Sequence, residues 1–238
     1  RHGAAVVMLK PAPDGTGIPV NLEDPASRAA IATHCLGSRL RNGSVLDAGF
    51  FFGPASFYGR LRSMPAATRK RFAMRGISFI NELSGPEHEL KSAQRRHARF
   101  VNSTMMVTAL GSAVSDGLAD GRVVSGVGGQ YNFVAMAHLL PGARSILCLR
   151  STRNKSGVVS SNIPWNYGHT TIPRHLRDIV VTEYGIADLR SRTDAEVVAA
   201  LVGITDARFQ DELVATAKRA GKLPADYRIP DQSRRNVT

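Results

Sequence analysis

The sequence has little cysteine, few aromatic residues and no long apolar run. Two cysteines in 238 residues, Cys35 and Cys148, cannot build a disulfide framework, which indicates a reducing compartment and favours a cytoplasmic location. No apolar stretch approaches the roughly 18 to 20 residues that a membrane helix needs, so no membrane association is expected. Aromatic residues make up 6% of the chain while glycine occurs 22 times, a balance typical of α/β proteins rather than β-sandwiches or coiled coils.

Metal-binding motifs, an initiator methionine and a signal peptide are also missing. None of the 7 histidines pairs with another His, Cys or carboxylate at a spacing such as HExxH or CxxC, so no metal is expected. The chain begins RHGAAVVMLKP, without an initiator Met and with an apolar core too short for a signal peptide. We therefore expect the chain to be cut from within a longer protein.

The charge balance is strongly basic. Lys and Arg number 31 against 19 Asp and Glu, a net charge of +12, which attracts nucleic acid, a membrane surface or a phosphorylated small ligand equally well. The basic run at residues 94–99 has no interleaved aromatic side chains, so a nucleic-acid-binding domain is the least favoured of these.

The hydrophobic pattern predicts an α/β chain in three parts. Residues 1–43 are expected to form a lead-in of loop and helix, residues 44–225 an α/β domain, and residues 226–238 a polar tail. Apolar runs predict strands at residues 45–52, 78–83, 99–110, 123–124, 145–149 and 179–182. Helical spacing or caps predict helices near residues 26–37, 54–64, 133–140, 193–202 and 206–220, the fourth with a Thr193–Glu196 capping box.

The centre of the chain predicts a parallel βαβ unit. Val123 and Val124 lead into SGVGGQ, residues 125–130, which we call the glycine loop; a helix and the strand at 145–149 follow. Ligands of such units bind at the carboxyl ends of the strands. The fold class is therefore an open, mostly parallel sheet flanked by helices.

The glycine loop has two interpretations. Glycines let a ligand approach the main chain, and the following helix offers unpaired amides to a phosphate or an oxyanion. A tight turn without a ligand fits the glycines equally well. No Lys-Ser/Thr follows, so the loop is not a P-loop, and Gly126 and Gly128 lack the third glycine of the dinucleotide fingerprint.

Two further segments follow predicted strands. Glu183 lies where a strand ends, a position that suits a functional carboxylate, although a structural hydrogen bond or ion pair is the commoner role. Arg153 and Lys155 follow the strand at 145–149, where they meet a phosphate or form a solvated basic loop.

Four strings together resemble the acetyl-CoA hydrolase/transferase family. They occur in the family's order and spacing: VNS (101–103), VVSGVGGQYNFV (123–134), RSILCLRSTR (144–153) and DIVVTEYGIADLR (178–190). The last two thirds of the chain resemble the family's C-terminal domain, and residues 13–64 resemble the lead-in of its longer bacterial members.

The resemblance implies a CoA-transferase fold of two similar open α/β domains with the active site between them. It implies a glutamate nucleophile that attacks an acyl-CoA thioester and passes through a glutamyl-CoA thioester, which a small carboxylate or water resolves. The Gly128 and Gly129 amides would stabilise the oxyanion. The residues implied to contact CoA are Gly126, Val127, Gly128, Gly129, Gln130 and Lys155, with Arg153 and Asn154 as further candidates.

The sequence departs from the family in two ways. The family's nucleophile precedes the segment resembling GSVLDAGFFFGP; Glu23 lies in a loop and Glu82 and Glu183 come too late, so we place the nucleophile on an upstream domain and expect this chain alone to bind CoA weakly without turnover. Met106, Thr108 and Asn132 stand where many members have acidic residues, so substrate choice stays open, as does a homodimer. The alternatives are a non-catalytic acyl-CoA-binding module and a nucleic-acid-binding domain.

Overall fold

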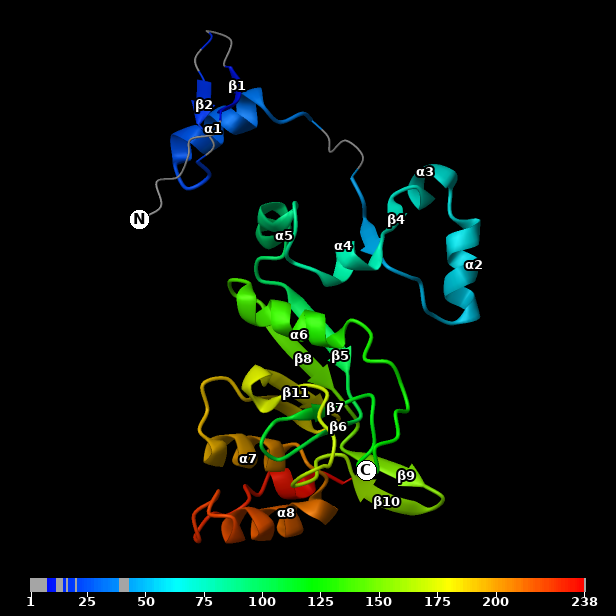
Figure 1. Cartoon of the computed structure of the whole chain (residues 1–238), viewed down its shortest axis with the longest axis vertical. Helices are drawn as coiled ribbons and strands as arrows, with labels where there is room; N and C mark the ends of the chain where they lie inside the picture. The colour runs from blue at the N-terminus through cyan, green and yellow to red at the C-terminus, as the bar shows by residue number, and fades with distance from the viewer. Residues whose placement is uncertain (1–7, 12–14, 16, 20, 39–42, 238) are drawn as a thin grey trace. The chain divides into compact units, whose positions relative to one another are not determined.

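The computed structural model describes residues 8–11, 15, 17–19, 21–38 and 43–237. Contacts divide the chain into two compact units, residues 1–75 and residues 76–238 (Figure 1). The domain boundaries expected at residues 43 and 225 stay a prediction, and the first adjoins residues 39–42, which lie outside the described part.

The first unit contains short elements. Strands β1 (Met8–Pro11) and β2 (Gly17–Pro19) form an antiparallel pair within the segment expected to be loop. Helix α1 (Pro25–His34) begins where the Asp24 carboxylate accepts a hydrogen bond from the Ser27 amide at 2.7 Å. The remaining elements are β3 (Leu46–Ala48), α2 (Ala55–Ser63), α3 (Ala66–Arg69) and β4 (Phe72–Met74), with β3 and β4 parallel.

The second unit is an α/β domain. Its helices are α4 (Ile77–Asn81), α5 (His88–Gln94), α6 (Gln130–Leu139), α7 (Asp194–Gly203) and α8 (Ala207–Arg219), with 3-10 turns η1 (Arg174–Leu176) and η2 (Ser233–Arg235). Its strands are β5 (Arg99–Ser103), β6 (Met106–Val107), β7 (Ala113–Val114), β8 (Arg144–Cys148), β9 (Thr152–Lys155), β10 (Val158–Ser161), β11 (Ile179–Thr182) and β12 (Gly185–Asp188).

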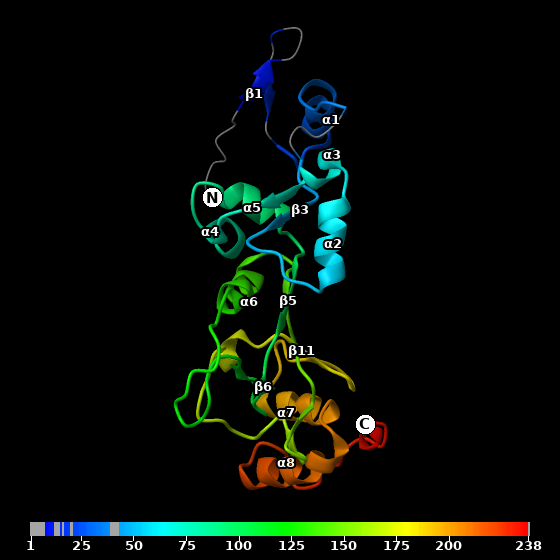
Figure 2. The ribbon, with the colours of Figure 1, turned by 90° about the vertical axis from the view of Figure 1, so that its right-hand side faces the viewer.

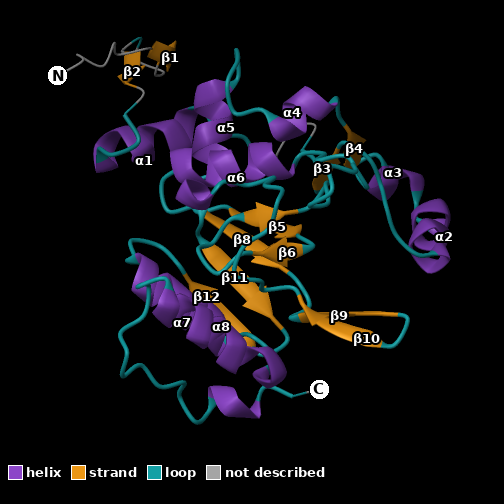
Figure 3. Ribbon diagram, turned by 60° about the horizontal axis from the view of Figure 1, so that its bottom comes forward, coloured by secondary structure: helices purple, strands orange, loops and turns teal. Residues whose placement is uncertain are grey.

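The central sheet of this domain has four strands in the order β12-β11-β8-β5. Strands β5, β8 and β11 are parallel, with Val101 opposite Ile146 and Ile146 opposite Ile179, and β12 adds an antiparallel edge. Helix α6 packs against β5 and β8 on one face, and α7 packs against β12 on the other (Figures 1 and 3). The predicted class, a mostly parallel sheet flanked by helices, is confirmed.

The core lies mainly between the sheet and helices α7 and α8. Helix α7 has a wide apolar face, and Val197, Val198, Leu201 and Val202 are fully buried. The predicted capping box begins this helix: the Glu196 carboxylate accepts from the Thr193 amide at 2.8 Å, and the Thr193 hydroxyl accepts from the Glu196 amide at 3.3 Å. Helices α7 and α8 lie next to each other (Figure 2).

Two predicted strands are wrong. Residues 78–83 fall in helix α4 and the turn after it, because a short apolar run fits a helix as well as a strand. Val123 and Val124 form no strand beyond one isolated bridge from Val123 to Gly117, and they are 74% and 51% exposed. The parallel βαβ unit therefore starts from β5, and a long excursion containing β6, β7 and the glycine loop precedes α6.

The segment expected to be a polar tail packs against the domain. Ile229 belongs to the core, and the Asn236 side-chain amide donates to the carbonyl oxygens of Gly203 and Thr205 at 2.8 and 3.0 Å. These bonds satisfy carbonyl groups at the end of α7, so residues 229–236 help to terminate that helix.

A buried aspartate begins helix α8. The Asp206 side chain is fully buried and accepts hydrogen bonds from the amide and guanidinium of Arg208 and, at 2.8 Å, from the Tyr184 hydroxyl. These bonds, those from Arg208 above all, lower the pKa of Asp206 to about 2.

Replacing this cap should destabilise the domain. Asp206→Ala removes an N-cap and takes a shared acceptor from the part-buried donors of Arg208 and Tyr184, so we expect the free energy of unfolding in urea to fall by about 1 to 2 kcal/mol at pH 7. Because the folded-state pKa lies below the ordinary 3.8, the stabilisation is present at neutral pH and is lost as the pH falls from about 4 towards 2.

Asp211→Ala is the matched control. Asp211 is 75% exposed and, among the described residues, pairs only with Arg234 on the surface, so its loss should change stability by less than about 0.5 kcal/mol. Equal losses in the two variants would contradict the role of Asp206.

Candidate functional site

Three parallel strands end at one edge of the central sheet. Strand β5 ends at Ser103, β8 at Cys148 and β11 at Thr182, and ligands of open α/β sheets bind at this edge. The glycine loop reaches the same edge, because the buried Gln130 side-chain amide donates to the Ser103 carbonyl at 2.9 Å. The structure thus places the loop at the end of β5, although the strand predicted to lead into it is absent.

The three glycines of the loop have different surroundings. A Cβ added at Gly126 or at Gly128 would meet no atom within 4 Å, so both face open space. Gly128 has a φ of +61°, which disfavours any other residue. A Cβ at Gly129 would lie 2.8 Å from the Asn81 amide nitrogen and 2.9 Å from a Phe133 ring carbon. Gly129 therefore allows helix α4 to approach the loop, and Gly126 and Gly128 leave the backbone accessible.

The main-chain amides of this segment are unpaired. Gly129 is the N-cap residue of helix α6 and has no side chain to cap the helix. Phe133 is the first residue of the helix whose amide donates a hydrogen bond to the main chain, to the Gly129 carbonyl at 3.0 Å. In the described part of the chain, no amide from Gly126 to Asn132 donates a hydrogen bond to the protein. Unpaired amides at the start of a helix favour an anion or a developing oxyanion.

An aspartate holds the segment that leads into the loop. The Asp116 carbonyl accepts hydrogen bonds from the amides of Val124 at 2.8 Å and Ser125 at 3.3 Å. Its carboxylate accepts from His169 Nε2 at 3.0 Å and from the Thr171 hydroxyl, and these two bonds, Thr171 first, lower the pKa of Asp116. The loop is therefore tied at its base to the segment of residues 169–171.

A glycine makes this contact possible. The position of a Cβ at Gly117 lies 2.6 to 2.8 Å from three atoms of the His169 ring, so only glycine lets the imidazole reach Asp116. Sequence reasoning missed Asp116, His169 and Thr171, because no local pattern signals a contact between residues more than fifty positions apart.

Buried polar atoms and exposed apolar side chains surround the loop. Gln130 Oε1 and Asn102 Nδ2 are buried without a hydrogen-bond partner among the described residues. Val123 is 74% exposed, Val127 39% and Tyr131 49%. Buried polar groups are normally paired, so the two unpaired atoms are typical of a binding surface.

The three predicted basic-loop residues form part of a hairpin that the sequence did not predict. Strands β9 and β10 pair antiparallel after the end of β8. Arg153 donates to the Ser161 carbonyl at 3.0 Å and the Asn162 side chain at 2.8 Å, and Asn154 accepts from the Gly157 amide at 3.0 Å. Lys155 is exposed and has no partner among the described residues. Arg153 and Asn154 thus stabilise the hairpin, whereas Lys155 is accessible to a ligand.

Glu183 makes contacts of a structural kind. It follows β11 directly, and its Oε2 accepts a hydrogen bond from the Ser151 amide at 2.8 Å, while Oε1 lies 4.0 Å from the Arg150 guanidinium. The Ser151 hydroxyl in turn accepts from the Asp206 amide at 2.8 Å. Glu183 therefore joins the ends of β8 and β11 to the start of α8.

Within the described ranges, no group of three or more His, Cys, Asp or Glu side chains could hold a metal ion. No helix in the same ranges is long and apolar enough to cross a membrane.

The family model described as the acetyl-CoA hydrolase/transferase C-terminal domain matches residues 53–217. The chain belongs to the acetyl-CoA hydrolase/transferase family. It is 34% identical over 121 residues to 4-hydroxybutyrate coenzyme A transferase of Clostridium kluyveri, covering 50% of this chain and 28% of that protein. It is 30% identical over 178 residues to succinyl-CoA:cyclohexane-1-carboxylate CoA transferase of Geobacter metallireducens, covering 74% and 38%.

A solved structure has a similar fold over the matched part. RipA from Yersinia pestis superposes with a TM-score of 0.60 at 28% identity, over 74% of this chain and 37% of that chain. The acetyl-CoA hydrolase/transferase assignment made from the four sequence strings is confirmed. The matched part spans 28% and 38% of the length of the two curated CoA transferases above.

Proposed function

We propose that this chain is the CoA-binding C-terminal portion of an acyl-CoA hydrolase or CoA-transferase, and that the glycine loop contacts the thioester end of the bound molecule. The observation that carries the proposal is the row of amides from Gly126 to Asn132, none of which is paired within the described chain. They lie at the carboxyl edge of a parallel sheet, beside two glycines that face open space.

The chemistry follows from the family. A glutamate carboxylate attacks the thioester carbonyl and expels the CoA thiolate, which leaves an acyl-glutamyl anhydride; the thiolate then attacks the glutamyl carbonyl and releases the acyl group as a carboxylate. An acceptor carboxylate reverses this sequence, or water hydrolyses the glutamyl-CoA thioester. The Gly128 and Gly129 amides would stabilise the oxyanions of these steps, each contributing about 3 kcal/mol in comparable sites.

We place the nucleophile on an upstream domain. Glu183 is held by the Ser151 amide at 2.8 Å and lies opposite Arg150, which supports a structural role for it. This chain alone should then bind acyl-CoA without turning it over, a result that a non-catalytic acyl-CoA-binding module would share.

The remaining contacts follow from exposure and charge. The exposed side chains of Val123, Val127 and Tyr131 offer apolar surface to the pantetheine arm. Lys155, on the hairpin that follows β8, would meet a CoA phosphate. Arg153 would support CoA binding by stabilising the hairpin that carries Lys155, because its guanidinium already donates hydrogen bonds to Ser161 and Asn162.

Calorimetry tests the proposal. We expect saturable heat when CoA is titrated into the chain at moderate salt, and no saturable heat with a duplex oligonucleotide. Salt-sensitive DNA binding without CoA binding would overturn the proposal and would favour the nucleic-acid-binding alternative. The sequence upstream of Arg1 distinguishes the proposed enzyme from a non-catalytic acyl-CoA-binding module. A glutamate in a family-like context there supports the enzyme.

A further inference from the structure

A cavity of about 590 Å³ opens at the edge of the sheet opposite to the glycine loop. Arg144 begins β8, Asp178 directly precedes β11, and His138 lies in the last turn of α6, so these lining residues mark the amino ends of the parallel strands. A strand of five residues spans about 17 Å. The cavity is therefore separate from the loop at the carboxyl ends.

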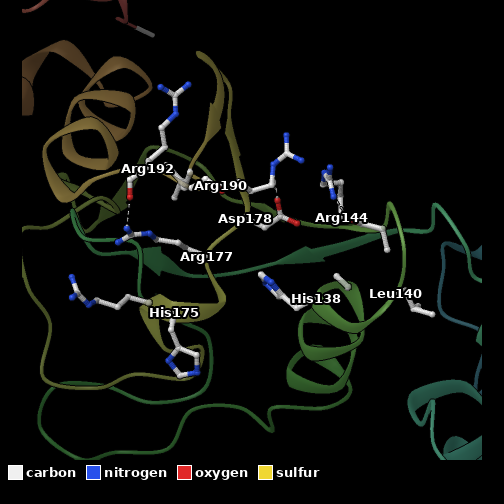
Figure 4. A pocket seen from close by; sticks show the side chains of 13 residues that line it. His138, Leu140, Arg144, His175, Arg177, Asp178, Arg190 and Arg192 are labelled. Carbon is white, nitrogen blue, oxygen red and sulfur yellow. Dashed lines mark hydrogen bonds and ion pairs between the residues drawn. The ribbon is translucent and has the colours of Figure 1, made fainter. Parts of the chain in front are cut away.

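The cavity is lined mainly by basic side chains. Five arginines and two histidines line it together with a single carboxylate, that of Asp178: Arg144, Arg174, Arg177, Arg190, Arg192, His138 and His175 (Figure 4). A concave site of this size fits a small molecule, and guanidinium groups bind phosphate oxygens through paired hydrogen bonds.

Neighbouring carboxylates neutralise only part of this charge. Asp194 pairs with Arg174, Arg177 and Lys222, Asp188 pairs with Arg190, and Glu196 pairs with Arg192. Arg190 also lies 3.3 Å from Asp178. Five cations thus share four carboxylates, and with Arg144, which has no ion pair among the described residues, the excess is two positive charges, the histidines not counted.

Arg144 is the cation without a carboxylate partner in the described part of the chain. Its only hydrogen bond there is to the carbonyl of the adjacent Ala143. In Figure 4 the Asp178 carboxylate lies between the side chains of Arg144 and Arg190. A half-buried guanidinium in a cavity of net positive charge is satisfied by an anion that enters from solvent.

Asp178 gives the cavity a hydrogen-bond acceptor beside these cations. Its side chain is 4% exposed, and its Oδ2 accepts from the Ser145 amide at 2.7 Å. Oδ1 is buried and accepts no hydrogen bond among the described residues, although it is the oxygen that forms the 3.3 Å ion pair with Arg190 Nε. A carboxylate oxygen has more than one acceptor position, so Oδ1 can also accept a hydrogen bond from a hydroxyl group.

We propose that this cavity binds a small organic phosphate, with its phosphate on Arg144 and a hydroxyl group donating to Asp178. The proposal does not depend on CoA binding at the glycine loop, because the two sites lie at opposite edges of the sheet. A ligand here contacts the end of α6, whose first turn carries the proposed CoA site.

Titration with ribose 5-phosphate at low salt tests the proposal in the wild-type chain. We expect saturable binding with one site, weaker binding of inorganic phosphate, which lacks the hydroxyl groups, and still weaker binding of citrate. Arg144→Gln should weaken ribose 5-phosphate binding by about tenfold, the loss expected of one charge-assisted hydrogen bond. Arg144 has no ion pair among the described residues to lose, so the circular dichroism of the variant should match the wild type.

Arg219→Gln is the matched control. It removes the same charge from an exposed position outside the cavity, where the guanidinium bonds, within the described ranges, only to Thr216 of the same helix, so binding should stay within twofold of the wild type. The proposal is overturned by the absence of saturable binding, by equal losses in the two variants, or by citrate binding as tightly as ribose 5-phosphate.

Discussion

Gly126→Val should abolish most CoA binding while leaving the stability of the domain unchanged. The position of the new side chain meets no protein atom within 4 Å, and the Gly126 backbone is in an ordinary region, so the fold can accept valine. The same side chain would occupy the space in front of the unpaired amides. Loss of one hydrogen bond to a charged or polarised oxygen weakens binding by about tenfold or more, measurable by calorimetry.

Two other glycine variants separate ligand access from folding. Gly76→Val adds the same side chain at another glycine with open surroundings and ordinary backbone, and CoA binding should be unchanged. Gly128→Val, at a φ of +61°, should lower both stability, by about 1 to 2 kcal/mol, and CoA binding. Wild-type CoA affinity in Gly126→Val would contradict the role of the loop.

Asp116→Asn should loosen the base of the glycine loop. The carboxylate holds His169 and Thr171, while the carbonyl of the same residue holds the amides of Val124 and Ser125. Weakening the carboxylate contacts should speed hydrogen exchange of those two amides by about tenfold, as expected for the loss of one net hydrogen bond. CoA binding should weaken in the same variant, because the glycine loop is then less ordered before CoA binds.

The wild-type chain should show the same loosening in acid. The pKa of Asp116 is lowered, so its bonds persist at neutral pH and are lost as the pH falls below the ordinary value of 3.8. The amide of Ser145, which is held by Asp178, is the internal control at neutral pH and should exchange at the wild-type rate in Asp116→Asn. Unchanged exchange at Val124 and Ser125 would show that Asp116 does not anchor the loop.

Local sequence patterns were sufficient to predict strand β11 and helices α7 and α8. The strand predicted at residues 179–182 is β11, and the Thr193–Glu196 capping box begins α7 as expected. Each rests on interactions between near neighbours, an apolar run in one case and a pair of reciprocal hydrogen bonds in the other. Helix α8 was predicted within one residue at each end for the same reason.

Contacts between distant residues account for the errors. Val123 and Val124 have the composition of a buried strand, yet the sheet position before α6 is taken by β5, more than twenty residues earlier. The hairpin of β9 and β10 carries mostly polar residues and gave no apolar pattern. The basic cavity depends on Arg144, Asp178 and Arg190 meeting from different elements, a proximity that spacing alone does not reveal.

Amide chemical shifts recorded while acetyl-CoA is added test the central claim most directly. The claim predicts that the amides of residues 126–132 shift together and saturate at a common concentration, with smaller changes at Lys155 on the hairpin. Shifts confined to other parts of the chain, or none along residues 126–132 at saturating acetyl-CoA, would contradict it.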